Sequence, residues 1–145
     1  MAGYLALGLL AILVAFALYV RLAPSDPARW HVAPRAEGPV GEVVVAGLNS
    51  ATLRLAPEAG PPADLLERLN TVALATPRTV RLAGSVEEGR ITWITRSGLW
   101  GFPDYTTAEA RPEGLYVEAR SRFGQGDLGV NAARLRDWLL RLLSP

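Results

Sequence analysis

Residues 104–123, which decide the fold of this chain, read DYTTAEARPEGLYVEARSRF. Two runs of alternating apolar and polar residues, 104–111 and 115–123, flank the turn Pro112-Glu113-Gly114, a pattern typical of a β-hairpin. Because side chains alternate along a strand, one face of the second run carries Leu115, Val117, Ala119 and Phe123, and the other carries Tyr116, Glu118, Arg120 and Arg122. One face of this hairpin is therefore apolar and needs a cover.

Two further strands precede the hairpin. Residues 79–86 and 90–99 have strand-like composition and are joined by the short turn Glu87-Glu88-Gly89. In the second of them, Ile91, Trp93 and Leu99 oppose Arg90, Thr92 and Arg96. Short turns join neighbouring strands, so residues 79–123 predict a four-stranded antiparallel meander. Residues 42–46 and 51–55 predict a possible additional hairpin around Leu48-Asn49-Ser50.

Two amphipathic helices are predicted to cover the apolar face of the sheet. The first spans residues 63–74, with its apolar stripe on Leu65, Leu66, Leu69 and Val72 or Ala73. The second spans residues 132–143, with Asn131 as its N-cap and an apolar stripe on Leu135, Trp138, Leu139 and Leu142. The expected fold class is α+β, with one domain over residues 41–145.

The N-terminus predicts a single transmembrane helix over residues 1–22, with residues 2–22 in contact with the lipid bilayer. The first charged residue is Arg21, and about twenty apolar positions match the thickness of a bilayer core. A cleaved signal peptide is the alternative, but nothing basic precedes this run and the cleavage site is poor. Residues 23–40 form a juxtamembrane linker whose four prolines disfavour both helix and strand pairing.

The arginines on the C-terminal side of the apolar run bear on location. Arg21, Arg29 and Arg35 follow the run, so the positive-inside rule weakly favours a cytoplasmic domain on a bacterial inner membrane. The side of the membrane stays open. A net charge of +1 gives no electrostatic argument for a nucleic-acid partner. With no cysteine and one histidine, His31, we expect no metal centre and no cofactor.

Residues 124–129, GQGDLG, fit the G-x-G-x-x-G spacing of a dinucleotide-binding turn. That fingerprint belongs to a strand–helix–strand unit with an acidic residue about 20 positions later. Here no strand signal follows the predicted final helix. We therefore interpret residues 124–131, which we call the glycine corner, as a tight strand-to-helix connection. Asp127 in this corner can pair with Arg120 or Arg122, or accept backbone N–H groups.

Three segments around this corner resemble a known family. Phe102-Pro103-Asp104-Tyr105, Ser121-Arg122-Phe123-Gly124 and Asp127-Leu128-Gly129-Val130-Asn131 are similar to family 1499 among the bacterial domains of unknown function. The resemblance covers about residues 62–143, and its most specific part is S-R-x-G-x-x-D-x-G-V-N. Many members carry serine where this chain has Gly126. The family implies no known reaction.

Five residues form the candidate polar cluster. They are Asp104, Arg120, Arg122, Asp127 and Asn131. We assign no catalytic residue. The leading hypothesis is a non-enzymatic module that binds a protein partner or an anionic or lipid ligand at the membrane surface. One alternative is a small hydrolase-like enzyme using Asp104 and Asp127, with Arg120 and Arg122 holding an anionic substrate. The other is a structural subunit of a membrane complex.

Overall fold

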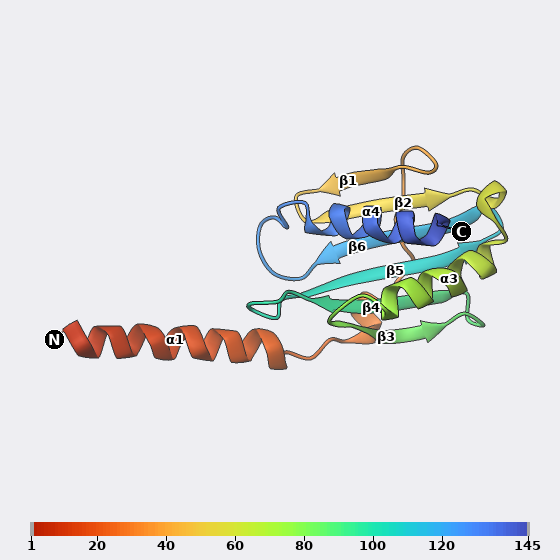
Figure 1. Ribbon diagram of the computed structural model, residues 1–145. Helices are drawn as coiled ribbons and strands as arrows, with labels where there is room; N and C mark the ends of the chain where they lie inside the picture. The colour runs from red at the N-terminus through yellow and green to blue at the C-terminus, as the bar shows by residue number, and fades with distance from the viewer. Residues whose placement is uncertain (1, 145) are drawn as a thin grey trace.

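The computed structural model describes residues 2–144, and its elements follow the predicted order (Figure 1). Six antiparallel strands form one sheet in the order β1-β2-β6-β5-β4-β3, so the first hairpin extends the meander at β6. The elements are α1 Ala2–Leu22, α2 Pro27–Trp30, β1 Val43–Gly47, β2 Ser50–Leu55, the 3₁₀ helix η1 Pro57–Ala59, α3 Pro62–Leu74, β3 Thr79–Ser85, β4 Arg90–Arg96, β5 Pro103–Arg111, β6 Gly114–Ser121 and α4 Val130–Leu143.

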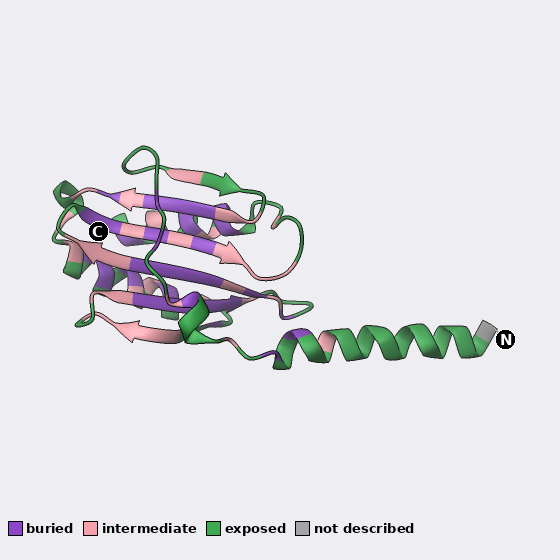
Figure 2. Cartoon of the chain, turned by 180° about the vertical axis from the view of Figure 1, so that it is seen from behind, coloured by how far each residue is buried: buried purple, intermediate pink, exposed green. Residues whose placement is uncertain are grey.

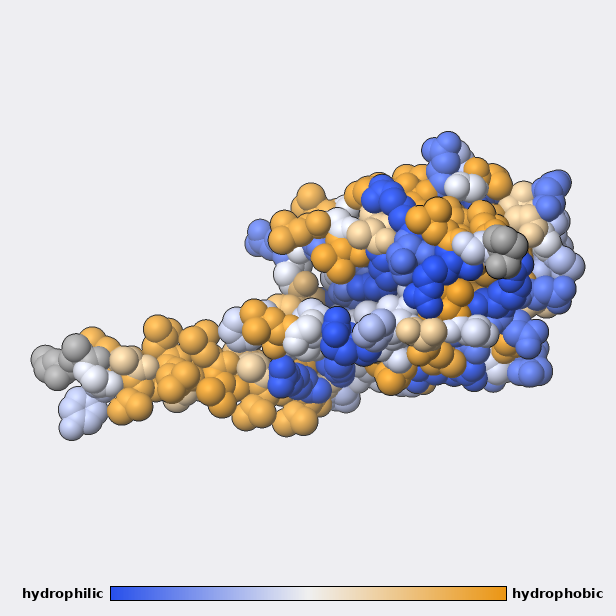
Figure 3. All heavy atoms as spheres, in the orientation of Figure 1, coloured by the Kyte–Doolittle hydropathy of each residue, from blue (hydrophilic) through white to orange (hydrophobic). Residues whose placement is uncertain are grey.

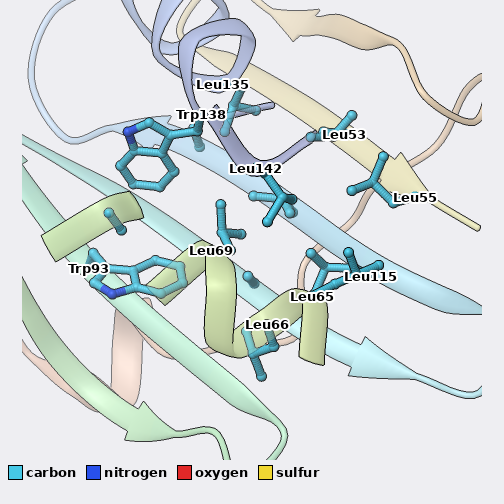
Figure 4. Packing of buried hydrophobic residues seen from close by; sticks show 14 of the residues in the cluster. Leu53, Leu55, Leu65, Leu66, Leu69, Trp93, Leu115, Leu135, Trp138 and Leu142 are labelled. Carbon is cyan, nitrogen blue, oxygen red and sulfur yellow. The ribbon is translucent and has the colours of Figure 1, made fainter. Parts of the chain in front are cut away.

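The main core lies between the sheet and the two long helices of the domain. Helix α4 packs over β1, β2 and β6, and α3 packs over β3, β4, β5 and β6 (Figure 1). The rings of Trp93 and Trp138 meet edge to face, with centroids 5.8 Å apart, among buried leucines from both helices (Figure 4). Full burial of each such side chain contributes about 1.5–3 kcal/mol. This core confirms the predicted apolar face of the sheet.

Two predicted strand ends are wrong. Strand β4 stops at Arg96 and β6 stops at Ser121, so Leu99 and Phe123 lie in loops. Leu99 is 77% exposed and does not join the core face. Leu99 lies in a loop between β4 and β5. Ser97 and Phe102 close this loop, because the Ser97 N–H donates to the Phe102 carbonyl and the Phe102 N–H donates to the Ser97 hydroxyl.

Glycine is required where β6 begins. The backbone of Gly114 has φ 135°, and an added Cβ would lie 1.9 Å from the carbonyl oxygen of Leu55. That distance is far inside van der Waals contact, so no other residue fits without moving β2. The Pro112-Glu113-Gly114 turn thus sets both the β5–β6 hairpin and the approach of β2.

Residues 23–42 cross the sheet on the face opposite the helices (Figure 2). Contrary to the expectation from its prolines, this segment contains one helical turn, α2. Pro27 occupies the first turn and the Asp26 carboxylate caps it by accepting the Ala28 N–H at 2.9 Å. The ring of Trp30, 8% exposed, stacks on Tyr105 with centroids 3.8 Å apart. The segment therefore buries part of the second face of the sheet, around Tyr105 and Ile94.

Helix α1 extends away from the domain as an apolar rod (Figures 1 and 3). It is long and apolar enough to cross a membrane, and an N-terminal signal sequence has the same properties. Its last turns contact the domain through Phe16 on Phe102 and Tyr19 on Phe123. Arg21 Nη2 also donates a hydrogen bond to the Leu99 carbonyl at 2.9 Å. These contacts place one end of the sheet beside the C-terminal end of α1.

Candidate functional site

The glycine corner adjoins a hydrogen-bonded carboxylate, that of Asp104 in β5. Asp104 of β5 and Ser121 of β6 are direct partners across the two strands. Ser121 Oγ donates to Asp104 Oδ1 at 2.7 Å, and Arg134 Nη2 of α4 donates to Asp104 Oδ2 at 2.6 Å. The Arg134 and Asp104 side chains are only 9% and 13% exposed. This ion pair therefore joins α4 to the end of the sheet.

Asn131 ends the glycine corner, and its predicted role as N-cap of α4 is wrong. The N-cap of α4 is Gly129, which has a left-handed backbone with φ 79°, and the helix begins at Val130, before Asn131. Asn131 is fully buried. Its Nδ2 donates to Ser121 Oγ at 2.9 Å, and its Oδ1 accepts from Arg134 Nη1 at 2.7 Å. Asn131 thus connects the serine and the arginine that hold Asp104.

Asp127 performs the capping that the sequence assigned to Asn131. Its Oδ1 accepts the Gly129 N–H at 2.9 Å, and its Oδ2 accepts the Asn131 N–H at 3.0 Å. Burial by itself would raise the pKa of this carboxyl, but the N–H groups of Asn131 and Gly129 lower that pKa below its usual value. The negative charge also suits the positive end of the helix dipole.

Arg120 and Arg122 lie on the other face of the sheet. Arg120 Nη2 donates to the Trp30 carbonyl at 3.0 Å, and Arg122 Nη1 donates to the Pro24 carbonyl at 2.8 Å. Neither forms an ion pair with Asp104 or Asp127 among residues 2–144. The cause is strand alternation, because Ser121 points to the helix side and its two neighbours point away from it. The structure brings together Asp104, Asp127 and Asn131 and separates the two arginines from them.

Arg134 and Ser121 are hydrogen-bonded to the candidate polar residues but are missing from the candidate set. Ser121 could have been found from the meander, because its strand register places it opposite Asp104. Arg134 lies three residues after Asn131, so both reach the same side of α4. No sequence feature distinguishes Arg134 from the exposed arginines of the same helix, and its burial is a tertiary result.

The chemistry available at the corner is limited by these hydrogen bonds. A pocket of about 270 Å³ adjoins the corner, and Asp104, Asp127, Phe102 and Phe123 line part of it. Both carboxylates already accept hydrogen bonds from protein groups. The Asp127 carboxylate also occupies the N–H groups that a phosphate would use at this helix N-terminus. Over residues 2–144, no group of three or more acidic or histidine side chains is arranged to hold a metal ion.

A second concave region is lined in part by the β4–β5 loop. It has a volume of about 470 Å³ and is lined by residues that include Arg21, Arg78 and Arg96. The three arginines come from the end of α1, the residue before β3 and the end of β4. We call this region the arginine pocket. Its lining contains no acidic residue.

Together, the fold and the corner define an apolar N-terminal helix followed by an α+β domain with a buried polar corner. The chain belongs to the family of proteins of unknown function DUF1499, which it matches over residues 24–142. The match confirms the resemblance and extends it toward the N-terminus, where it includes the segment that crosses the back of the sheet. No curated protein matches this chain.

Proposed function

We propose that this chain is a single-pass protein of the bacterial inner membrane, whose α+β domain rests on the bilayer surface as a non-enzymatic interaction module. The observation that carries the proposal is the collection of exposed apolar loop residues at the end of the sheet from which α1 leaves. Leu48 is 80% exposed, Leu99 is 77% exposed and the Leu128 side chain is fully exposed. Apolar residues that gather at one place on the surface, unlike apolar residues scattered singly, mark interaction surfaces.

The strand register places these three loops at one end of the molecule. The β1–β2 turn carries Leu48, the β4–β5 loop carries Leu99 and the glycine corner carries Leu128. Ser50, Arg120 and Tyr105 are aligned across neighbouring strands near the strand ends. All three loops therefore extend from the same end of the sheet. Leu128 also has φ 52°, a conformation that costs free energy for a side chain with a Cβ.

The contacts of α1 support a bilayer as the occupant of this surface. Phe16 lies six residues before the end of α1, about 9 Å along the helix axis at 1.5 Å per residue. Its contact with Phe102, and that of Tyr19 with Phe123, set these domain rings beside the last turns of α1. If α1 spans the membrane, those rings lie at the depth where aromatic side chains are enriched. Figure 3 shows apolar side chains on the part of the domain next to α1.

Charge is distributed to suit the same orientation. The end near α1 carries Arg21, Arg78 and Arg96, whereas Glu87, Glu88 and Glu113 occupy exposed turns at the opposite end. An anionic membrane surface attracts the basic end and repels the acidic end. The hydrogen bonding of Asp104 and Asp127 favours a binding role over the hydrolase alternative, because both carboxylates already accept hydrogen bonds from protein donors that hold the fold.

The test uses the absence of cysteine from the chain. Single variants Leu99→Cys, Leu128→Cys and Glu113→Cys, in the full chain, are labelled with an environment-sensitive fluorophore and reconstituted in nanodiscs. We expect quenching by lipids that carry doxyl groups near the headgroup for the probes at 99 and 128, and none for the probe at 113. Equal exposure of all three probes to water would contradict the docking proposal.

Retention of α1 is measured separately. The intact mass of protein extracted from membranes should include α1, and alkaline carbonate should leave the protein in the membrane. A mature protein that begins after about residue 23 would identify α1 as a signal sequence and overturn the anchor. Recovery of a stable stoichiometric partner protein, with water-exposed probes at 99 and 128, would favour the structural-subunit alternative.

A further inference from the structure

We propose that the arginine pocket binds the phosphate group of an anionic phospholipid. This inference deepens the proposed function, on which it rests for the position of the pocket at the bilayer. It assigns a lipid class to one site formed by Arg21, Arg78 and Arg96. The glycine corner takes no part in it, because its charged groups are already satisfied.

The charge of the pocket is not balanced by the protein. Among residues 2–144, no carboxylate lies within 4.0 Å of the guanidinium groups of Arg21, Arg78 or Arg96, although five other arginines have such a partner. Three like charges around one concave surface repel each other, and a bound anion removes that repulsion. Arginine binds a phosphate group strongly, because two parallel N–H groups of the guanidinium match two of the phosphate oxygens.

The guanidinium groups are held in place by backbone carbonyls. Arg21 donates to the carbonyls of Leu99 and Trp100, and Arg96 Nη1 donates to that of Gly101 at 2.9 Å. Arg78 Nε donates to the Arg96 carbonyl at 3.0 Å. Each guanidinium has five N–H donors, so these four bonds leave most donors of the three groups for a ligand.

The backbone at Arg78 gives an independent indication. Arg78 has φ 59°, which is uncommon for a residue with a side chain, and glycine would adopt it without strain. The conformation is kept by a hydrogen bond from the Arg96 N–H to the Arg78 carbonyl at 3.0 Å. Glycine would suit this backbone better, so the presence of arginine is explained if the Arg78 side chain binds a ligand.

A lipid fits the surroundings of the pocket better than a soluble anion. Arg21 lies in the last turn of α1, and the loop that lines the pocket continues into Leu99 and Trp100, which are 77% and 37% exposed. Apolar side chains beside a phosphate site are suited to the glycerol and acyl regions of a phospholipid. Aromatic and aliphatic side chains next to basic groups are common at membrane interfaces.

The test is a titration of the full chain in a neutral detergent, so that it does not depend on docking to a bilayer. Binding of short-chain phosphatidylglycerol is measured by calorimetry, with short-chain phosphatidylcholine and inorganic phosphate as separate arms. We expect phosphatidylglycerol to bind, and both Arg78→Gln and Arg96→Gln to weaken it about tenfold, as loss of a charge-assisted hydrogen bond implies. The matched control Arg136→Gln removes an exposed arginine of α4 outside the pocket and should bind like the wild type.

Each outcome decides between the possibilities. Inorganic phosphate that binds as tightly as the lipid, with the same loss in the variants, would make this a soluble-anion site and overturn the lipid assignment. No binding by the wild type, or equal weakening by Arg136→Gln, would overturn the site itself. Arg78 is exposed, so Arg78→Gln carries the test if Arg96→Gln does not fold. If docking fails in nanodiscs but this titration succeeds, the site stands and the proposed orientation does not.

Discussion

At the scale of single residues, the polar corner shows how a few buried groups connect separate elements. Asp104, Ser121, Asn131 and Arg134 form a closed set of hydrogen bonds between two strands and one helix. Inside a protein, such a set is stabilising only while every member keeps its partners. The corner is therefore a stabilising feature whose single members are costly to remove.

The buried ion pair between Arg134 and Asp104 should stabilise the fold. We expect Arg134→Met to lower the free energy of unfolding by about 3 kcal/mol, because it leaves the Asp104 carboxylate buried without its cation. The exposed Arg136 on the same helix is the control, and Arg136→Met should change this free energy by about 0.5 kcal/mol or less. Urea unfolding of the full chain in detergent, followed by tryptophan fluorescence, measures both. Equal effects of the two substitutions would show that the ion pair does not stabilise the fold.

At the scale of elements, α4 depends on a carboxylate outside its own first turn. The pKa of the Asp127 carboxyl is below its unfolded value of 3.8, since hydrogen bonds from Asn131 and Gly129 outweigh the opposing effect of burial. A lowered folded pKa means that the stabilisation is fully present above the unfolded pKa. It is lost as the pH falls from there through the folded pKa.

Asp127→Asn should therefore reduce the acid-range slope of stability. In the wild type, the free energy of unfolding should decrease as the pH falls below about 4, and the variant should show a shallower decrease. Asp127→Ala, measured at neutral pH, should cost about 1 kcal/mol through loss of the cap. Urea unfolding from pH 6 to pH 3 measures these changes. Identical slopes for the wild type and Asp127→Asn would contradict the capping role.

Residues 23–42, which cross the back of the sheet, also contribute to the stability of the domain. Trp30→Ala removes the ring stacked on Tyr105 and should lower the free energy of unfolding by about 3 kcal/mol. Val32, which is exposed two residues later, gives the control Val32→Ala with a much smaller effect. Thermal unfolding of the full chain compares the two variants. A negligible effect of Trp30→Ala would mean that this segment is a linker that merely lies near the sheet.

At the scale of the whole molecule, the proposal requires the domain to lie on one defined side of the membrane. The arginines after α1 favour the cytoplasmic side. Glu113→Cys, at the acidic end of the domain, should resist an impermeant maleimide in intact cells and react after the inner membrane is permeabilised. A periplasmic protein in the same cells provides the positive control. Labelling of Glu113→Cys in cells with an intact inner membrane would place the domain on the outer side.

Much of the fold could be predicted because it depends on local patterns. Alternation in residues 104–123 set the two faces of the hairpin, and apolar spacing located α3 and α4. The predicted strand ends were wrong where contacts between separate residues end the strand, as at Leu99, which belongs to a loop held by Ser97 and Phe102. The candidate site was predicted in part: Asp104, Asp127 and Asn131 come together, and Arg120 and Arg122 do not. Strand alternation already implies that these two arginines point away from Ser121.

Local sequence patterns were enough to predict the α+β class, the apolar N-terminal helix and the strand-to-helix connection at the glycine corner. These follow from periodicity, turn chemistry and length, which act between neighbours in the chain. The pairing of Arg134 with Asp104, and the approach of Arg21, Arg78 and Arg96 to one pocket, arise only in the folded chain. The physical reason is that these groups are far apart in sequence. Their approach depends on strand register and helix packing, which no single stretch of the chain encodes.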